Sequence, residues 1–154
     1  MKRRSFLKGT LAGSTVAVAV SAGLLAPGQV LAAAWPKSAF DAKNVADALA
    51  GIGAGSPSMS GDISIKAPDI AENGAVVPIT VETGIKGVTA IAILAEKNAS
   101  PLAANFVLGK NADGYVSTRI KMVKTSNVIA VVSAGGKTFS NKKEVKVTIG
   151  GCGG

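Results

Sequence analysis

The stretch Lys143–Ile149, Lys-Glu-Val-Lys-Val-Thr-Ile, alternates polar and apolar residues from Glu144 to its end. In an extended chain Val145, Val147 and Ile149 would lie on one face, and Lys146 and Thr148 on the other. This pattern predicts a β-strand with one buried face. It is the last of a series of such segments, and the series decides the expected fold.

Short segments of strand-forming residues precede it, each bounded by turn residues. They are Ile63–Lys66, Val76–Thr83, Val88–Glu96, Leu102–Leu108, Tyr115–Val123, Val128–Ser133 and Lys137–Phe139. Gly135-Gly136 indicates a hairpin turn, and Pro78 within a strand indicates an edge or a bulge. About seven or eight short strands with turns every 8–12 residues predict an all-β fold, an antiparallel β-sandwich over residues 62–149.

Residues 35–53 have a different character and predict one helix. Apolar residues recur at roughly helical spacing, Ser38 can cap the start, and Gly51 and Gly53 end the pattern. Residues 53–61 are a loop by composition. The expected organisation is a helix and loop over 35–61, the sandwich over 62–149, and an arm over 150–154.

The first 34 residues have the features of a signal peptide. Arg3-Arg4 precede Phe6-Leu7-Lys8, a short apolar run follows, and Ala32–Ala34 provide a small-residue cleavage site. The arginine pair indicates the twin-arginine export route. We therefore expect a periplasmic protein beginning near Trp35; an uncleaved anchor is the alternative.

Composition excludes several functions. The formal net charge is +8 from 17 basic and 9 acidic residues. Four basic and no acidic residues lie in the signal, which leaves 13 − 9 = +4, a mild charge that does not favour nucleic acid. There is no histidine and one cysteine, so a histidine base, an internal disulfide and a cysteine-cluster metal site are excluded. We expect no catalytic residues, no cofactor, no metal and no membrane partner.

The single cysteine, Cys152, lies within Gly150-Gly151-Cys152-Gly153-Gly154 at the C-terminus. Cysteine is usually buried, and an exposed one is usually retained for its chemistry. Glycines restrict the backbone least and present no side chains. The pattern predicts a flexible arm that presents a thiol to another protein's active site, with a frayed tail as the plain alternative.

Three segments together resemble a known family. They are Glu72–Thr83 (ENGAVVPITVET), Asn98–Phe106 (NASPLAANF) and the terminal Gly150–Gly154 (GGCGG). With the export signal, they make the chain similar to the SoxY family, the sulfur-carrier subunits of the periplasmic thiosulfate-oxidising Sox system. The resemblance runs from the signal to the last glycine.

The resemblance implies a fold, partners and a mechanism. It implies an immunoglobulin-like sandwich that forms a heterodimer with a SoxZ subunit, and Cys152 as the covalent sulfur attachment site. The c-type cytochrome SoxAX would join thiosulfate to the cysteine, and the hydrolase SoxB would release sulfate. A sulfane dehydrogenase, where present, would oxidise the remaining persulfide sulfur. The chain itself would be a carrier and not an enzyme.

Other interpretations remain at this stage. A structural or adhesion sandwich could use Cys152 for an intermolecular disulfide. A ubiquitin-like sulfur carrier would be activated at the terminal Gly-Gly. This activation requires ATP, which the periplasm does not provide, and it leaves the cysteine unexplained. Lipid-attachment motifs place the cysteine elsewhere. Lys142-Lys143 is most simply a solvated strand entry, with partner contact as the alternative.

Overall fold

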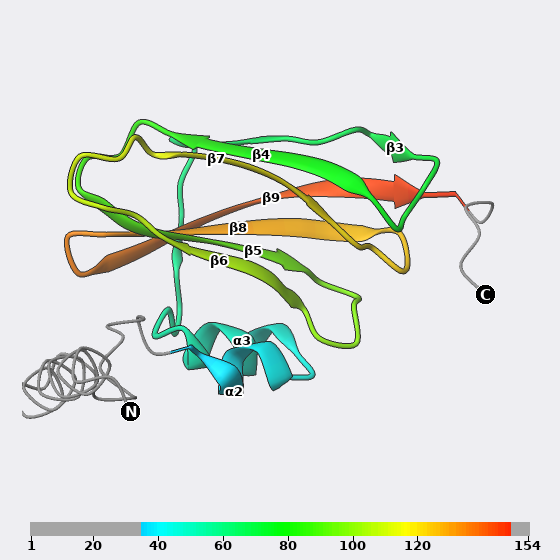
Figure 1. Cartoon of the computed structure of the whole chain (residues 1–154), viewed down its shortest axis with the longest axis horizontal. Coiled ribbons are helices and arrows are strands. Elements are labelled where there is room, and N and C mark those ends of the chain that lie inside the picture. Colours follow the sequence, from blue (N-terminus) through cyan, green and yellow to red (C-terminus); the bar gives the residue numbers. More distant parts are fainter. Residues whose placement is uncertain (1–34, 149–154) are drawn as a thin grey trace, which may run out of the picture. The chain divides into compact units, whose positions relative to one another are not determined.

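The computed structural model describes residues 35–148, which form two short helices and nine strands (Figure 1). The helices are α2 (Lys37–Asp41) and α3 (Val45–Gly51). The strands are β1 (Ser58–Met59), β2 (Ile63–Lys66), β3 (Ile70–Ala71), β4 (Val77–Thr83), β5 (Val88–Ala95), β6 (Leu102–Val107), β7 (Tyr115–Ile120), β8 (Ser126–Ala134) and β9 (Lys137–Val147).

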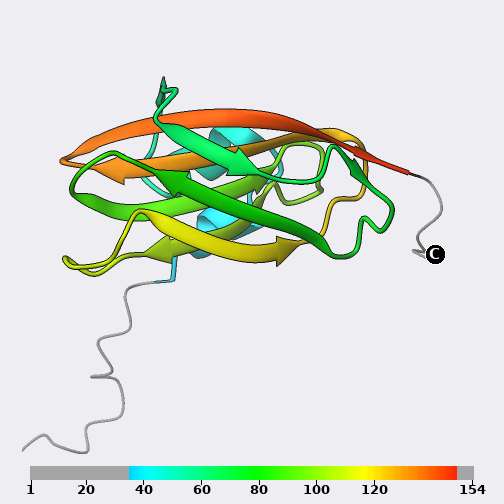
Figure 2. The same cartoon turned by 90° about the horizontal axis from the view of Figure 1, so that it is seen from above.

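Two sheets stack face to face, which confirms the predicted β-sandwich. The larger sheet has the order β1-β9-β8-β5-β6, with β3 also pairing with β9, and the smaller has the order β2-β4-β7. All pairs except those of β1 and β3 with β9 are antiparallel. Figure 2 looks onto the smaller sheet, with the larger sheet beneath it.

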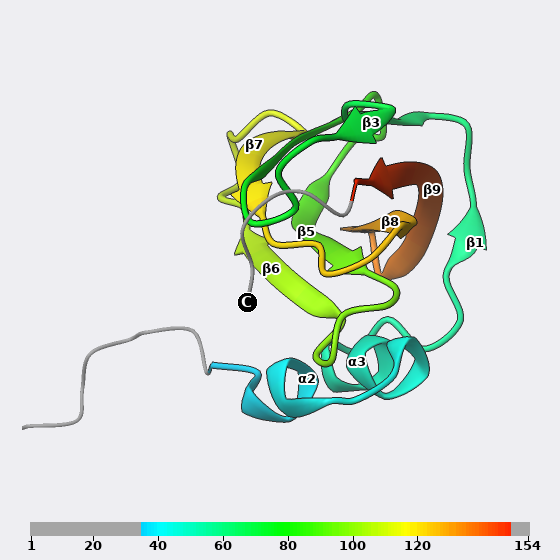
Figure 3. The same cartoon turned by 90° about the vertical axis from the view of Figure 1, so that its right-hand side faces the viewer.

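The outer edge of β9 is covered by two short parallel strands. Ser58 and Met59 of β1 pair with Phe139 and Ser140, and β3 pairs further along with the last residues of β9. Between them the chain crosses to the smaller sheet as β2. Figure 3 shows β1 and β3 on either side of β9. The two short strands therefore cover this edge of β9 near its two ends.

Two apolar clusters explain why β5 and β8 are nearly continuous apolar runs. Ile91 and Ile93 of β5 point between the sheets, whereas Ala92 and Leu94 point outward to a second cluster with the helices. In β8, Val132 belongs to the cluster between the sheets and Val131 to the cluster with the helices. A strand buried on both faces loses the alternation that marks a half-buried strand.

The prediction of one helix over 35–53 is wrong, because two helices form. Ala42 is extended between them, with ψ of 143°. The Asn44 side chain then accepts a hydrogen bond from the Asp47 backbone N–H at 2.8 Å and begins α3. Ser38 caps nothing, since Pro36 occupies the cap position of α2 without a side-chain bond. An asparagine that bonds locally competes with continuous helix and favours a new start.

Four smaller expectations also change or gain detail. The segment predicted as a loop contains β1, and the two predicted last strands are one strand, β9. Gly135 and Gly136 have φ of 57° and 73°, which confirms the hairpin turn. Pro78 lies in the central strand β4, but β2 pairs with β4 only from Thr80 onward, so Pro78 has a strand partner on one side only.

Candidate functional site

The predicted attachment residue and its arm lie outside the described residues. This applies to Cys152 and to Gly150, Gly151, Gly153 and Gly154, as well as to the signal peptide. The last described residue is Thr148, one residue after β9 ends at Val147. The part of the site that can be described is therefore the place where the arm begins. We call it the arm root: residues 69–76, 121–125 and 146–148.

Hydrogen bonds from β3 and its flanking residues hold one edge of the arm root. The Lys146 N–H donates to the Asp69 carbonyl at 3.0 Å, and the Thr148 N–H donates to the Ala71 carbonyl at 3.1 Å. The second of these bonds lies beyond the end of β9. The main chain is thus held by backbone pairing up to the last described residue.

The loop between β7 and β8 holds the other edge. The Thr125 hydroxyl accepts from the Val147 N–H at 2.9 Å and donates to the Val147 carbonyl at 3.4 Å. One side chain thereby satisfies both backbone groups of Val147, which would otherwise lack partners where the sheet ends. The end of β9 is consequently fixed between β3 and this loop.

Gly74 packs closely against both parts of the arm root. A Cβ atom at this position would lie 2.4 Å from the Met122 carbonyl oxygen and 2.8 Å from a Val147 side-chain carbon. The Met122 N–H also donates to the Gly74 carbonyl at 2.7 Å. The space exists only because glycine has no side chain.

Asn98 anchors the same loop from the β5–β6 connection. Its side chain donates to the Lys121 carbonyl at 2.7 Å and accepts from the Val123 N–H at 3.1 Å. Gly74 and Asn98 belong to the two internal segments that carry the family resemblance. Both segments therefore converge on the loop that holds Val147.

Sequence reasoning did not identify these positioning residues. Gly74, Asn98 and Thr125 are uncharged residues in turns, and nothing in their local pattern points to the end of the chain. The available signal was that Asn73-Gly74 and Asn98 sit in the two resembling segments although no strand requires them there.

Lys143 is not simply a solvated strand entry, because its side chain is bonded within the sandwich. Its ammonium donates to the Ala67 carbonyl at 2.7 Å and pairs with Asp69 at 3.0 Å. It therefore joins β9 to the connection between β2 and β3. Lys142 is exposed, as predicted.

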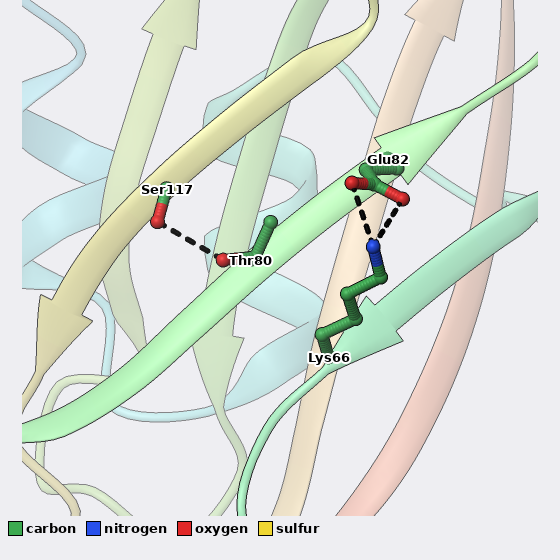
Figure 4. A network of polar contacts seen from close by, with 4 residues as sticks. All are labelled: Lys66, Thr80, Glu82 and Ser117. Carbon is green, nitrogen blue, oxygen red and sulfur yellow. Dashed lines mark hydrogen bonds and ion pairs between the residues drawn. The ribbon is translucent and has the colours of Figure 1, made fainter.

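The outer face of the smaller sheet is polar and internally paired (Figure 4). Lys66 pairs with Glu82 at 2.8 Å, and the hydroxyls of Thr80 and Ser117 lie 2.9 Å apart. The hydrogen bond to Glu82 raises the pKa of Lys66 above its ordinary value. Cross-strand pairs of this kind stabilise the exposed face of a sheet.

An open cavity of about 380 Å³ lies beside the turn between β4 and β5. In Figure 1 this turn is at the opposite end of the sandwich from the end of β9. Its lining includes Asp62, Glu82 and Gly114 together with the β4–β5 turn. Within residues 35–148 no three metal-binding side chains come together. No helix in this part of the chain is long and apolar enough to cross a membrane.

The fold and the arm root define a class of protein: a small β-sandwich whose C-terminal strand is held firmly at its end. The model of the family "Sulfur oxidation protein SoxY" matches residues 49–152. The chain belongs to the SoxY family.

Comparison with solved structures agrees with this assignment. The chain is 47% identical to the sulfur carrier protein SoxY from Chlorobium limicola f thiosulfatophilum, with a TM-score of 0.58, over 67% of this chain and 96% of that one. A superoxide reductase (neelaredoxin) from Ignicoccus hospitalis has a TM-score of 0.50 at 16% identity, over 56% and 80% of the two chains, and shares the fold alone. Comparison with curated proteins gives no match.

Membership in the family establishes the function at a general level. The chain is a sulfur carrier of the Sox system and is not itself a catalyst. The predicted family, the immunoglobulin-like sandwich and the carrier role are confirmed.

Proposed function

We propose that Cys152 is the covalent attachment site for sulfur intermediates in thiosulfate oxidation. The observation that carries the proposal is that the family match extends through residue 152, the only cysteine of the chain. Further support comes from the arm root, because hydrogen bonds hold the chain up to Thr148, four residues before the thiol.

The attachment step joins the Cys152 sulfur to the outer sulfur of thiosulfate. A new S–S bond forms, the thiol proton is released, and two electrons leave one at a time through the haem of the partner cytochrome, which passes each on to a further acceptor. Water then cleaves the bond between the sulfane sulfur and the sulfonate, giving sulfate and a persulfide on Cys152. A dehydrogenase would then oxidise the outer persulfide sulfur to a sulfonate, with three water molecules supplying the oxygen atoms and six electrons passing to the electron acceptor of that dehydrogenase. A second hydrolysis releases this sulfur as sulfate and restores the thiol.

This division of chemistry fits a chain without histidine. Electron transfer belongs to the haem protein SoxAX, hydrolysis to SoxB and persulfide oxidation to a sulfane dehydrogenase where present. SoxZ is the proposed partner in a heterodimer. The twin-arginine pattern at Arg3-Arg4 supports export to the periplasm, where these partners would act.

The decisive experiment compares Cys152→Ser with the wild-type protein after incubation with thiosulfate and the partner cytochrome. We expect intact-mass spectrometry to detect a thiosulfate adduct on the wild type and none on the variant, because a serine hydroxyl cannot form a bond to sulfur of the disulfide type. Gly153→Ala, which keeps the thiol, is the matched control and should gain the adduct.

Measuring the free energy of unfolding shows whether Cys152→Ser loses the adduct because the thiol is missing or because the protein is unfolded. Cys152 follows the last described residue of the sandwich, so Cys152→Ser should change the free energy of unfolding by no more than about 0.5 kcal/mol. Urea denaturation checks this. An adduct on the serine variant would show that the attachment site lies elsewhere.

A further inference from the structure

We propose that the arm root is a docking surface for the enzyme that loads Cys152. The mouth of that enzyme's active-site channel would carry apolar residues surrounded by a rim of acidic residues. The inference rests on the proposed function, since it assumes that the thiol enters another protein. The surface consists of Ile70, Val76 and Val123 with Lys121 and Lys124.

The length of the arm requires close contact at this surface. Cys152 is four residues beyond Thr148, and an extended chain spans at most about 3.3–3.6 Å per residue, or roughly 14 Å in total. An enzyme that encloses the thiol in a channel must therefore bring the channel mouth against the arm root. The residues around Thr148 must therefore lie close to the channel mouth when the thiol is inside the channel.

Exposed apolar side chains gather at the arm root. Ile70, Val76 and Val123 are 57%, 50% and 49% exposed, and they are three of the seven large apolar side chains exposed among residues 35–148. Each belongs to a segment that is bonded to the end of β9 or to the loop beside it. Exposed apolar side chains on the segments that a partner must approach favour a protein–protein contact there.

Two lysines on either side of Val123 provide the charge of the surface. Lys121 and Lys124 are exposed, and neither forms an ion pair with another of the residues from 35 to 148. The nearby carboxylates of Asp69 and Glu96 have partners in Lys143 and Asn127, which leaves Glu72 as the unpaired carboxylate of the arm root. Unpaired lysines beside an apolar residue favour an acidic rim on the partner.

The arm root is held in one conformation by hydrogen bonds, and this also favours docking. Asn98 and Gly74 hold the loop of Lys121–Thr125 in place, and Thr125 holds Val147. A surface that is ordered before binding loses less conformational entropy when it binds. The same bonds define the point from which the arm extends.

The test measures how fast the partner cytochrome loads Cys152 with thiosulfate, expressed as kcat/KM for the carrier. Lys121→Glu/Lys124→Glu should lower kcat/KM by about tenfold or more at low salt, with the difference shrinking as salt rises. The matched control, Lys86→Glu/Lys110→Glu, changes the net charge equally in turns at the opposite end of the sandwich and should change kcat/KM less than twofold.

A second pair of variants tests the apolar part. Val76→Ser/Val123→Ser should lower kcat/KM, whereas Tyr115→Ser, at the exposed start of β7, should not. All variants should react at the wild-type rate with a small disulfide reagent, since the defect lies in docking. If the thiol of a lysine variant reacted with a small anionic reagent at a rate different from that of the wild type, the lysines would act on the reactivity of Cys152 itself. That result would overturn the docking proposal.

The outcomes distinguish the two proposals. If the wild type loads at Cys152 and the arm-root variants load as fast as their controls, the docking proposal is wrong and the carrier mechanism stands. If the wild type gains no adduct at Cys152, the proposed function is wrong and the docking proposal fails with it.

Discussion

Gly74 is the residue on which the packing at the end of β9 depends most directly. Its backbone does not need positive φ, so only the lack of a side chain is required. Gly74→Ala should lower the free energy of unfolding by about 1–3 kcal/mol, because the new methyl group overlaps the Met122 carbonyl and Val147. Urea denaturation monitored by tryptophan fluorescence or circular dichroism measures the change.

Gly84→Ala is the matched control for Gly74→Ala. A Cβ atom at Gly84 would meet nothing within 4 Å, and its φ is not positive. The control should be neutral, or stabilise the protein by up to about 1 kcal/mol through a less flexible unfolded chain. Equal effects at the two positions would argue against tight packing at the arm root.

At the scale of an element, α3 depends on its N-cap. Asn44→Ala removes the bond to the Asp47 N–H and should lower the free energy of unfolding by about 1 kcal/mol. Ser38→Ala, at the position that sequence pattern favours as a cap, should change it by less than about 0.5 kcal/mol, since Ser38 makes no cap bond. Thermal or urea unfolding of both variants decides between one helix capped by Ser38 and two helices.

The cap matters because the helices cover one face of the larger sheet. Ala48 of α3 packs in the same apolar cluster as Leu94 and Val131. Loosening α3 would expose outward-facing residues of β5 and β8, so the effect of Asn44→Ala should reach the sandwich. Hydrogen exchange of the β5 amides should be faster in this variant than in Ser38→Ala.

At the scale of the whole molecule, the two edges of the larger sheet differ. The β9 edge is covered by β1 and β3, whereas β6 is the last strand of the sheet at the other edge within residues 35–148. The sequence of β6, Leu102–Val107, contains no charged residue. Natural edge strands usually carry charge to prevent pairing with other chains, so an uncharged edge suits a protein that functions with a partner.

We therefore expect the mature chain to form a heterodimer with a SoxZ subunit. Size-exclusion chromatography with light scattering of the co-expressed pair should give a mass about equal to the sum of the two chains. The carrier alone, at the same concentration, is the control, with about 12 kDa per chain for some 120 residues. A co-expressed sample containing only free carrier monomer would contradict the expectation.

The amino-acid sequence by itself determined most of the longer strands, the hairpin at Gly135-Gly136 and the family. These features depend on local alternation, on turn residues with special φ, and on short motifs, all of which can be read without knowing which segments meet. The same holds for Cys152, which stands out in the sequence as the only cysteine and by the glycines on both sides of it. Its role nevertheless stays a prediction, because it lies outside the described residues.

Only the tertiary structure decided how the end of β9 is held. Gly74, Asn98 and Thr125 are separated by more than twenty residues from one another, and their contacts arise when strand pairing brings three connections to one end of the sandwich. The break between α2 and α3 had the same origin in part, since Gly51 must approach Ala39 at a distance that excludes a Cβ atom. Periodicity reports which face of a segment is buried, but it does not report what that face packs against.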